Sequence, residues 1–232
     1  MSKKNSHKGF IIAIAVAFLL PLSLYLLVKT LSKDKIFLPK FYIVDRVDER
    51  TVDGKKVQDT VYHQVADLRL TNQLNEQVSL NNDLKGKIIV MDFFFVNCPS
   101  ICPKLTGNMT MLQRAFKKND TSVHLISITV NPERDTPAVL RAYADKFKVN
   151  HDHWWFLTGN KEVIYNFARN ELGVSVQPSE GGADDFTHTE KIVLIDQQRY
   201  IRGYYNGLDT AELRRCADDI VLLTLEKKKK RK

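Results

Sequence analysis

The stretch IIVMDFFFVNCPSICP, residues 88–103, decides the fold of this chain. Its first nine residues, 88–96, form a continuous apolar and β-branched run, which predicts a strand buried on both faces. Two cysteines and two prolines follow, and then a helical pattern begins. The apolar face of that helix holds Leu105, Met109, Leu112 and Phe116. The stretch therefore predicts a buried strand, a cysteine turn and a helix in succession.

Strands and helices alternate through the rest of the body. Later strands are expected at 123–130, 155–157, 192–195 and 200–205, with helices starting at Thr136-Pro137, Asn160 and Asp209. Residues 41–65 predict a hairpin that turns at Asp53-Gly54. This alternation implies an α/β fold with a mostly parallel sheet covered on both faces. A closing hairpin and helix, with a cysteine pair after the first buried strand, is the thioredoxin-like arrangement.

The net charge of +8 does not indicate a nucleic-acid-binding protein. Nine of the 35 basic residues lie in two tails, 1–9 and 227–232, which leaves 26 bases against 27 acids elsewhere. A nucleic-acid-binding domain needs a basic face on its folded body. The tails are therefore expected to be solvated or to touch anionic lipid.

Residues 10–28 contain no charged side chain over 19 positions, close to the length that crosses a bilayer as a helix. A cleaved signal peptide is the alternative, but its apolar region is shorter and ends in small residues. We therefore expect a transmembrane anchor at 10–28, a linker at 29–40 and a folded domain at 41–225. The tail 1–9 is too short for mitochondrial targeting and lacks arginine, which favours a bacterial inner membrane with the domain in the periplasm.

Cys98 and Cys102 are four positions apart where a strand ends and a helix begins. That spacing places both sulfurs on one helical face, and the helix N-terminus favours thiolates. We therefore expect two exposed, acidified thiols, with a pair of core cysteines or an inert disulfide as the alternative. Two thiolates suit a dithiol redox pair or one soft metal ion, Cu(I) or Zn(II).

A metal held by two cysteines needs a third ligand, and His188 is the favoured candidate. It lies just before the strand at 192–195, in the loop that faces the cysteine turn in thioredoxin-like folds. His63 and His124 lie within expected strands and are expected to face solvent or to be satisfied locally. His151 and His153 are expected to be exposed, and Cys216 is expected to be a buried apolar residue.

The segments FFFVNCPSICP, ITVNPERDTP, WFLTG and FTHTEKIVLID resemble the SCO/SenC family, in the same order, over about residues 66–223. The resemblance implies a membrane-anchored thioredoxin fold that binds copper and helps to assemble the dinuclear copper site of cytochrome c oxidase. It implies that Cys98, Cys102 and His188 hold the metal. The family pattern has Asp-Pro where this chain has Asn131-Pro132, which puts the role of that carboxylate in doubt here.

The resemblance implies a copper chaperone that holds one Cu(I), and tolerates Cu(II), and passes it to the copper-receiving subunit of the oxidase. The alternative is an enzyme, a thiol–disulfide oxidoreductase that reduces the oxidase cysteines, with Cys98 attacking and Cys102 resolving. A thiol peroxidase of this fold would need an activating Thr and an Arg around its reactive cysteine, and the sequence near Cys98 offers no such set. A structural zinc site lacks a convincing fourth ligand.

Overall fold

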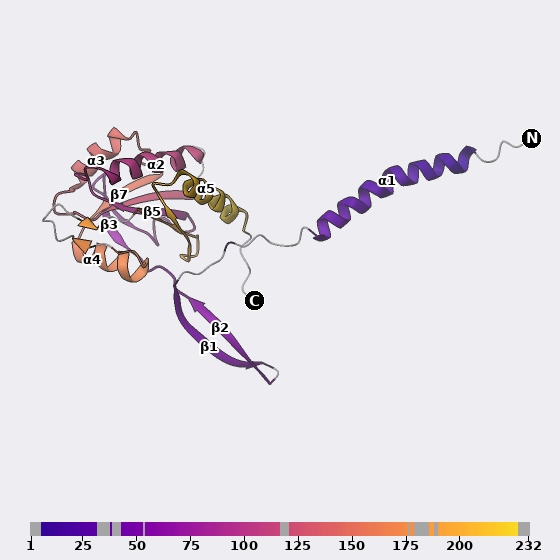
Figure 1. Ribbon diagram of the computed structural model, residues 1–232, viewed down its shortest axis with the longest axis horizontal. Helices are drawn as coiled ribbons and strands as arrows, with labels where there is room; N and C mark the ends of the chain where they lie inside the picture. Colours follow the sequence, from indigo (N-terminus) through magenta and orange to yellow (C-terminus); the bar gives the residue numbers. More distant parts are fainter. Residues whose placement is uncertain are drawn as a thin grey trace, which may run out of the picture. The chain divides into compact units, whose positions relative to one another are not determined.

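The computed structural model describes residues 6–31, 38, 43–52, 54–116, 121–175, 177–178, 186–187 and 190–226 (Figure 1). The chain divides into two compact units, Met1–Phe37 and Leu38–Lys232. Most of the predicted linker 29–40, and most of the tails 1–9 and 226–232, lie outside the described residues.

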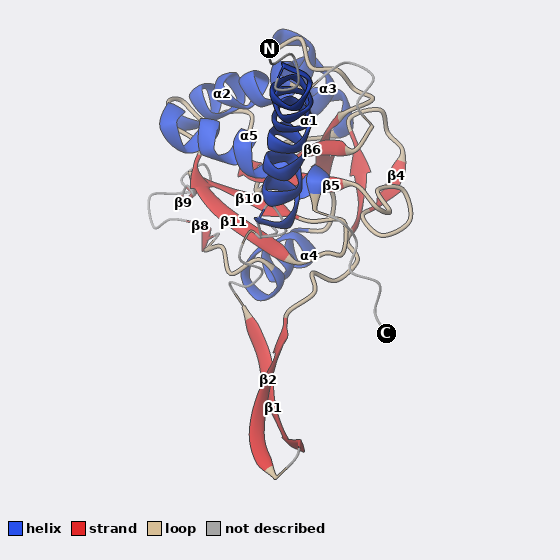
Figure 2. Cartoon of the chain, turned by 90° about the vertical axis from the view of Figure 1, so that its right-hand side faces the viewer, coloured by secondary structure: helices blue, strands red, loops and turns tan. Residues whose placement is uncertain are grey.

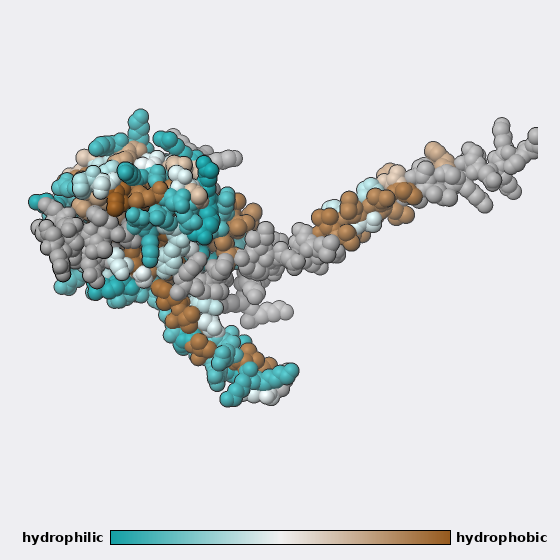
Figure 3. Space-filling model, in the orientation of Figure 1, coloured by the Kyte–Doolittle hydropathy of each residue, from teal (hydrophilic) through white to brown (hydrophobic). Residues whose placement is uncertain are grey.

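The first unit contains one long helix, α1, Ser6–Leu31, which covers the predicted anchor and has Pro21 within it. Side chains such as Phe18 and Leu19 are exposed on it, and Figure 3 shows this apolar surface in brown. Across the part of the chain that is described, no helix is found to combine the length and apolar character of a membrane span. The anchor at 10–28 stays a prediction.

The second unit begins with the expected hairpin, which confirms the prediction for residues 41–65. Strands β1, Val44–Val52, and β2, Lys55–Tyr62, pair antiparallel, and Gly54 takes a positive φ of 75° in the turn. Val44 faces Tyr62 and Arg46 faces Val61, so Asp45 is an extra residue in a β-bulge. Every residue of β1 is exposed, and Figure 1 shows the two strands as a ribbon apart from the main sheet.

The main sheet has seven strands in the order β11-β10-β5-β6-β7-β3-β4. Their bounds are β3 Arg69–Asn72, β4 Gln77–Ser79, β5 Ile88–Phe94, β6 Val123–Thr129, β7 Trp154–Thr158, β10 Lys191–Ile195 and β11 Ile201–Asn206. All residues of β5 and β6 are buried, as expected for central strands with apolar side chains on both faces. A separate short pair joins β8, Gln177–Pro178, to β9, Phe186–Thr187.

The prediction of a mostly parallel sheet was wrong. Only the pairs β5–β6 and β6–β7 run parallel among the described strands of this sheet, and the outer pairs are antiparallel. The hairpins β3–β4 and β10–β11 lie at the two edges, and the inner strand of each runs antiparallel to its neighbour, β7 or β5. A hairpin reverses the chain direction, whereas a helical crossover preserves it.

Four helices cover the sheet, and Figures 1 and 2 show α2, α3 and α5 on one side and α4 on the other. Their bounds are α2 Ile101–Ala115, α3 Pro137–Lys146, α4 Lys161–Asn166 and α5 Thr210–Leu225, and the π-helical turn η1, Phe167–Glu171, extends α4. The predicted helix starts at Asn160 and Asp209 are confirmed. Asn160 accepts from the Val163 N–H at 3.1 Å, and Asp209 accepts from the Ala211 N–H at 2.8 Å.

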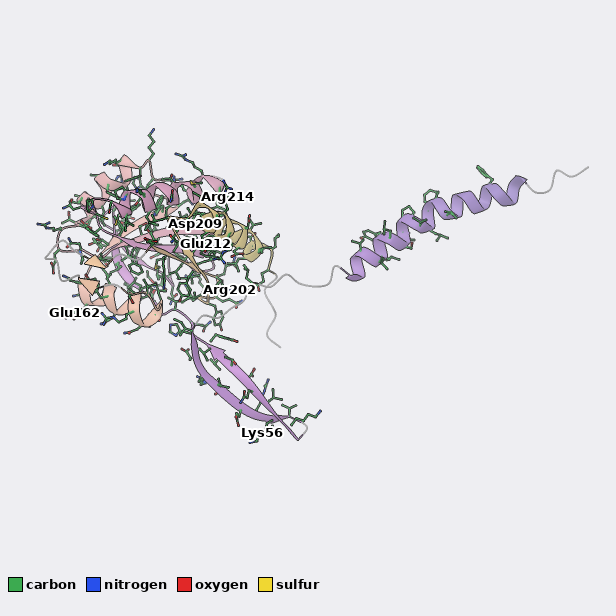
Figure 4. The ribbon with its side chains drawn as sticks, in the orientation of Figure 1. Lys56, Glu162, Arg202, Asp209, Glu212 and Arg214 are labelled. Atoms are coloured by element: carbon green, nitrogen blue, oxygen red, sulfur yellow. The ribbon has the colours of Figure 1, made fainter. Side chains whose placement is uncertain are left out.

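Arg202 on β11 joins both ends of the second unit (Figure 4). Its side chain is 1% exposed and forms ion pairs with Asp196 at 2.9 Å and with Glu226, which ends α5, at 2.8 Å. The same guanidinium donates to the carbonyl oxygen of Leu38 at 2.7 Å. A buried guanidinium is stable because each of these acceptors replaces lost water contacts.

Candidate metal and redox site

The cysteine turn connects the end of β5 to the start of α2. Cys98 lies in the turn and Cys102 lies in the first turn of α2. The backbone N–H of Cys102 donates to the sulfur of Cys98 at 3.3 Å. The N–H of Cys98 in turn donates to the Phe95 carbonyl at 3.4 Å, which folds the turn back onto the strand. The structure therefore brings the two predicted cysteines together.

Both thiols are buried, so the expectation of exposed thiols was wrong. Cys98 is 4% exposed and Cys102 is 3% exposed, and both belong to the hydrophobic core with Phe95 and Leu105. The cause is long-range packing, since Cys102 lies on the buried face of α2 with Leu105 and Met109. The three cysteines of the chain are in the free thiol form. Two thiols that are close, buried and unbonded remain available for a soft metal or for a disulfide.

The two thiols differ in acidity. Burial disfavours the thiolate of Cys98, but hydrogen bonds from the Cys102 thiol and from the backbone N–H groups of residues 100–102 outweigh burial and lower the pKa of Cys98. Burial raises the pKa of Cys102, and its hydrogen bond to Cys98 raises that pKa further. The expectation of two acidified thiols was therefore wrong for Cys102. One thiol is prepared to ionise and the other holds its proton.

Asp135 holds the residues before Cys98 in place. Its carboxylate is 2% exposed and accepts from the Val96 N–H at 3.1 Å and from the Thr129 hydroxyl. Val96 lies two residues before Cys98, so this carboxylate ties the exit of β5 to the end of β6. The following helix begins with Thr136 as its N-cap and Pro137 in its first turn, as predicted.

Asn131, which replaces the family's aspartate, lies in the same loop. It is 4% exposed, and its backbone N–H donates to the Thr129 hydroxyl at 3.0 Å. Its carbonyl oxygen accepts from the N–H of Arg134 at 3.1 Å and of Asp135 at 3.0 Å. The backbone of Asn131 therefore shapes the loop that positions the Asp135 carboxylate.

Asp92 is a buried carboxylate on β5 that the sequence reasoning passed over. Its Oδ1 atom accepts from the Ser127 hydroxyl at 2.5 Å, and that hydroxyl accepts from the Trp154 indole N–H at 2.9 Å. Its Oδ2 atom has no hydrogen-bond partner. Burial raises the pKa of Asp92 to about 7, and its charge also raises the pKa of Cys102. The signal in the sequence was one acid inside an otherwise apolar strand.

His188, the predicted third ligand, lies outside the described residues, one position after the end of β9. Within the described ranges, no group of three or more His, Cys, Asp or Glu side chains could hold a metal ion. Cys216 is fully buried on α5, as expected. The third ligand stays a prediction.

Two other histidines, His124 and His151, differ from expectation. His124 on β6 is fully buried against the Trp155 ring, with centroids 4.3 Å apart, and neither ring nitrogen has a hydrogen-bond partner. The expectation that His124 would face solvent or be satisfied locally was wrong. His151 is largely buried and hydrogen-bonds Gln73 and Asp145, each at 2.9 Å, rather than being exposed.

Comparisons with known proteins identify relatives over most of the chain. A sequence profile of the SCO1/SenC family matches residues 57–221. The SCO1 protein homolog of Bacillus subtilis (strain 168) is 33% identical over 169 residues, which are 72% of this chain and 84% of that protein.

Two solved structures share the fold. BsSco, described as a member of the Sco family of cytochrome c oxidase assembly proteins with a disulfide switch, is 32% identical with a TM-score of 0.62, covering 71% of this chain and 95% of its own. ScoI of Bradyrhizobium japonicum with copper bound is 28% identical with a TM-score of 0.58, covering 69% of this chain and 99% of its own. These similarities confirm the mixed α/β, thioredoxin-like fold, and the chain belongs to the SCO1/SenC family.

Proposed function

We propose that this chain binds one copper ion through Cys98, Cys102 and His188 and delivers it to the dinuclear copper site of cytochrome c oxidase. The observation that carries the proposal is the contact between the Cys102 N–H and the Cys98 sulfur at 3.3 Å, which places two thiols side by side. Thiolate sulfur is a soft ligand and selects Cu(I) over hard cations. The relative from Bradyrhizobium japonicum, solved with copper bound, supports the same cargo.

The acidity of the two thiols suits a metal that must be both bound and released. Metal binding requires thiolates, so each thiol gives up its proton when copper enters. The lowered pKa of Cys98 makes it the first donor, and the raised pKa of Cys102 opposes the second ionisation. A proton that returns to Cys102 would therefore assist the transfer of copper to a partner's ligands.

His188 is proposed as the third donor because of its place in the chain. It follows β9 directly and precedes β10, which lies beside β5 in the sheet, and β5 leads into the cysteine turn. An imidazole nitrogen is a good ligand for copper when it is neutral. Two sulfurs and one nitrogen leave room for an incoming ligand, so copper can pass to the partner by ligand exchange.

The test is an anaerobic Cu(I) titration of the full chain in detergent micelles against a competing chromogenic chelator. We expect one equivalent bound by the wild type, none held tightly by Cys98→Ser/Cys102→Ser, and at least about 10-fold weaker binding by His188→Ala. Cys216→Ser and His151→Gln are the matched controls and should bind as the wild type does. Wild-type affinity in the double serine variant would refute the proposed site.

A second candidate function is thiol–disulfide exchange, with the same two cysteines reducing those of the oxidase. It is favoured by the unequal acidity of the pair, since a reactive thiolate and a protonated partner suit attack and resolution. The disulfide switch of BsSco points the same way. A reductase retains its exchange rate in His188→Ala, whereas a copper carrier loses tight binding in that variant.

We also propose that residues 10–28 anchor the chain in a bacterial inner membrane with the second unit in the periplasm. The support is the absence of charge over 19 residues. The chain should stay with membranes during alkaline carbonate extraction and be digested by protease added to spheroplasts. Release by carbonate, or protection of the second unit in intact spheroplasts, would refute this topology.

A further inference from the structure

His63 lies at the base of the hairpin between two carboxylates from different elements. Its Nδ1 atom is 2.9 Å from Oδ1 of Asp45 on β1, and its Nε2 atom is 3.0 Å from Oε2 of Glu171, the last residue of η1. The ring is only 17% exposed. Among the described residues, these two carboxylates are the titratable groups in hydrogen-bond contact with the ring.

Two local irregularities of the backbone create this arrangement. Asp45 is the extra residue of the β-bulge in β1, and a bulge redirects a side chain that regular pairing would send elsewhere. Glu171 ends a π-helical turn, which also shifts a side chain from its α-helical position. Both departures from regular structure aim a carboxylate at the same imidazole.

The chemistry of the contacts fixes the protonation of the group. An ionised carboxylate only accepts hydrogen bonds, and a neutral imidazole has one N–H donor and one bare nitrogen. A neutral His63 would therefore point a lone pair at one of the two carboxylates. Both contacts are hydrogen bonds when the ring carries a proton on each nitrogen.

His151 in the same chain shows the opposite solution. Its Nε2 atom is 2.9 Å from Asp145, and its Nδ1 atom is 2.9 Å from the amide nitrogen of Gln73. That amide is oriented by the Trp154 carbonyl and the Phe156 N–H, so it donates to the ring. A neutral ring satisfies both partners of His151, and no second proton is needed.

On the η1 side of the contact with His63, the backbone and the Glu171 side chain are held by further hydrogen bonds. Glu171 also accepts from the Ala66 N–H at 2.8 Å, and the next residue, Leu172, accepts from the Tyr204 hydroxyl of β11 at 2.8 Å. On the hairpin side, β1 is exposed along its length, and the chain after β2 is held to the sheet by the Gln64–Tyr200 bridge and by the Val65 N–H, which donates to the Arg199 carbonyl at 2.9 Å. An isolated two-stranded hairpin is marginally stable in water.

We propose that His63 is a pH-sensitive latch that fixes the base of the β1–β2 hairpin to η1 when its ring is doubly protonated. Loss of one proton removes one charge-assisted hydrogen bond and leaves a lone pair facing a carboxylate. The latch is therefore closed while both ring nitrogens carry protons and opens when one of the two protons is lost. This inference does not depend on the proposed copper function.

Two measurements on the full chain in detergent micelles test the latch. Ring 15N spectra should show both nitrogens of His63 protonated at about pH 5. Hydrogen exchange of the His63 amide, which donates to the Ile43 carbonyl at 3.0 Å, should rise about 10-fold from about pH 5 to about pH 8 after correction for intrinsic chemistry.

Variants separate the latch from general stability. His63→Gln should remove the pH response, and the control His151→Gln should keep it. Glu171→Gln replaces the carboxylate with a neutral amide, and the single atom that contacts both His63 and the Ala66 N–H cannot donate to one while it accepts from the other. The contact with the doubly protonated ring loses its charge, so exchange in that variant should be faster than in the wild type at about pH 5. A bare His63 nitrogen at about pH 5, or wild-type exchange that is flat with pH, would overturn the proposal even if a variant does not fold.

Discussion

The backbone N–H of Val96 donates to the carboxylate of Asp135 at 3.1 Å, across 39 positions of sequence. This bond fixes the direction in which the chain leaves β5 and enters the cysteine turn. The same carboxylate accepts from the Thr129 hydroxyl, so two neighbouring strand ends share one buried anion. The geometry of the two thiols therefore depends on a residue that contacts neither of them in the described hydrogen bonds.

Replacing Asp135 should loosen the cysteine turn. Asp135→Ala leaves the Val96 N–H without an acceptor in a buried place, which costs about 2 kcal/mol of unfolding free energy. Urea unfolding of the full chain, followed by the fluorescence of Trp154 and Trp155, measures this loss. Glu133→Gln is the control, since that side chain is 71% exposed and should change stability by less than about 0.5 kcal/mol. Equal stability of Asp135→Ala and the wild type would contradict the anchoring role.

Asp92 should make the fold less stable as the pH rises. Its pKa in the folded chain is about 7, above the ordinary value of 3.8, so the folded state holds a proton that the unfolded state has lost. Stability from this group is therefore full below about pH 4 and is lost as the pH rises through about 7, by about 4 kcal/mol. Asp92→Asn should remove that slope in urea unfolding at several pH values. The exposed control Asp152→Asn should keep it, and a slope unchanged by Asp92→Asn would rule the assignment out.

His124 should act in the opposite direction. Burial lowers its pKa to about 3, below the ordinary value of 6.5, so the unfolded state binds a proton that the folded state does not. Stability from this group is full above about pH 6.5 and is lost as the pH falls towards 3, by about 4 to 5 kcal/mol. His124→Phe keeps a ring against Trp155 and should resist acid better than the wild type. The control His151→Gln should not gain acid resistance, and the absence of any gain in His124→Phe would count against this account.

The two site thiols should react with an alkylating agent in a fixed order. The lowered pKa of Cys98 gives it more thiolate than Cys102 at any pH between their two values, so Cys98 should be labelled at least about 10-fold faster. Mass spectrometry of digested, partly labelled full chain gives the two rates. Cys216 is an internal control, because burial raises its pKa and it should be labelled only after unfolding. Faster labelling of Cys102 would reverse the assigned roles.

Local patterns predicted the elements that depend on neighbours in sequence. The strand before the cysteines, the hairpin with its Gly54 turn and the cap at Asn160 follow from periodicity and turn chemistry within a few residues. The sequence could not show that Cys102 would be buried, because that depends on how α2 packs against the sheet. It could not reveal the bond between Asp135 and Val96 either, since nothing local pairs residues so far apart.

The faces of strands were harder to predict than the strands themselves. His124 was expected to face solvent or to be satisfied locally because it is polar, yet β6 lies at the centre of the sheet and both of its faces are covered. The mixed direction of the sheet was missed for a related reason. Hairpins at the edges and crossovers at the centre produce similar apolar runs, and only the connections distinguish them.

Arg202 sets the limits within which this domain can be shortened for biochemical work. Its guanidinium needs the Leu38 carbonyl at the beginning of the second unit and the Glu226 carboxylate at the end of it. A fragment that starts after residue 38 leaves the buried guanidinium without its carbonyl acceptor. One that stops before residue 226 removes an ion-pair partner of that buried cation, which costs about 3 to 5 kcal/mol. Soluble fragments should therefore retain both residues.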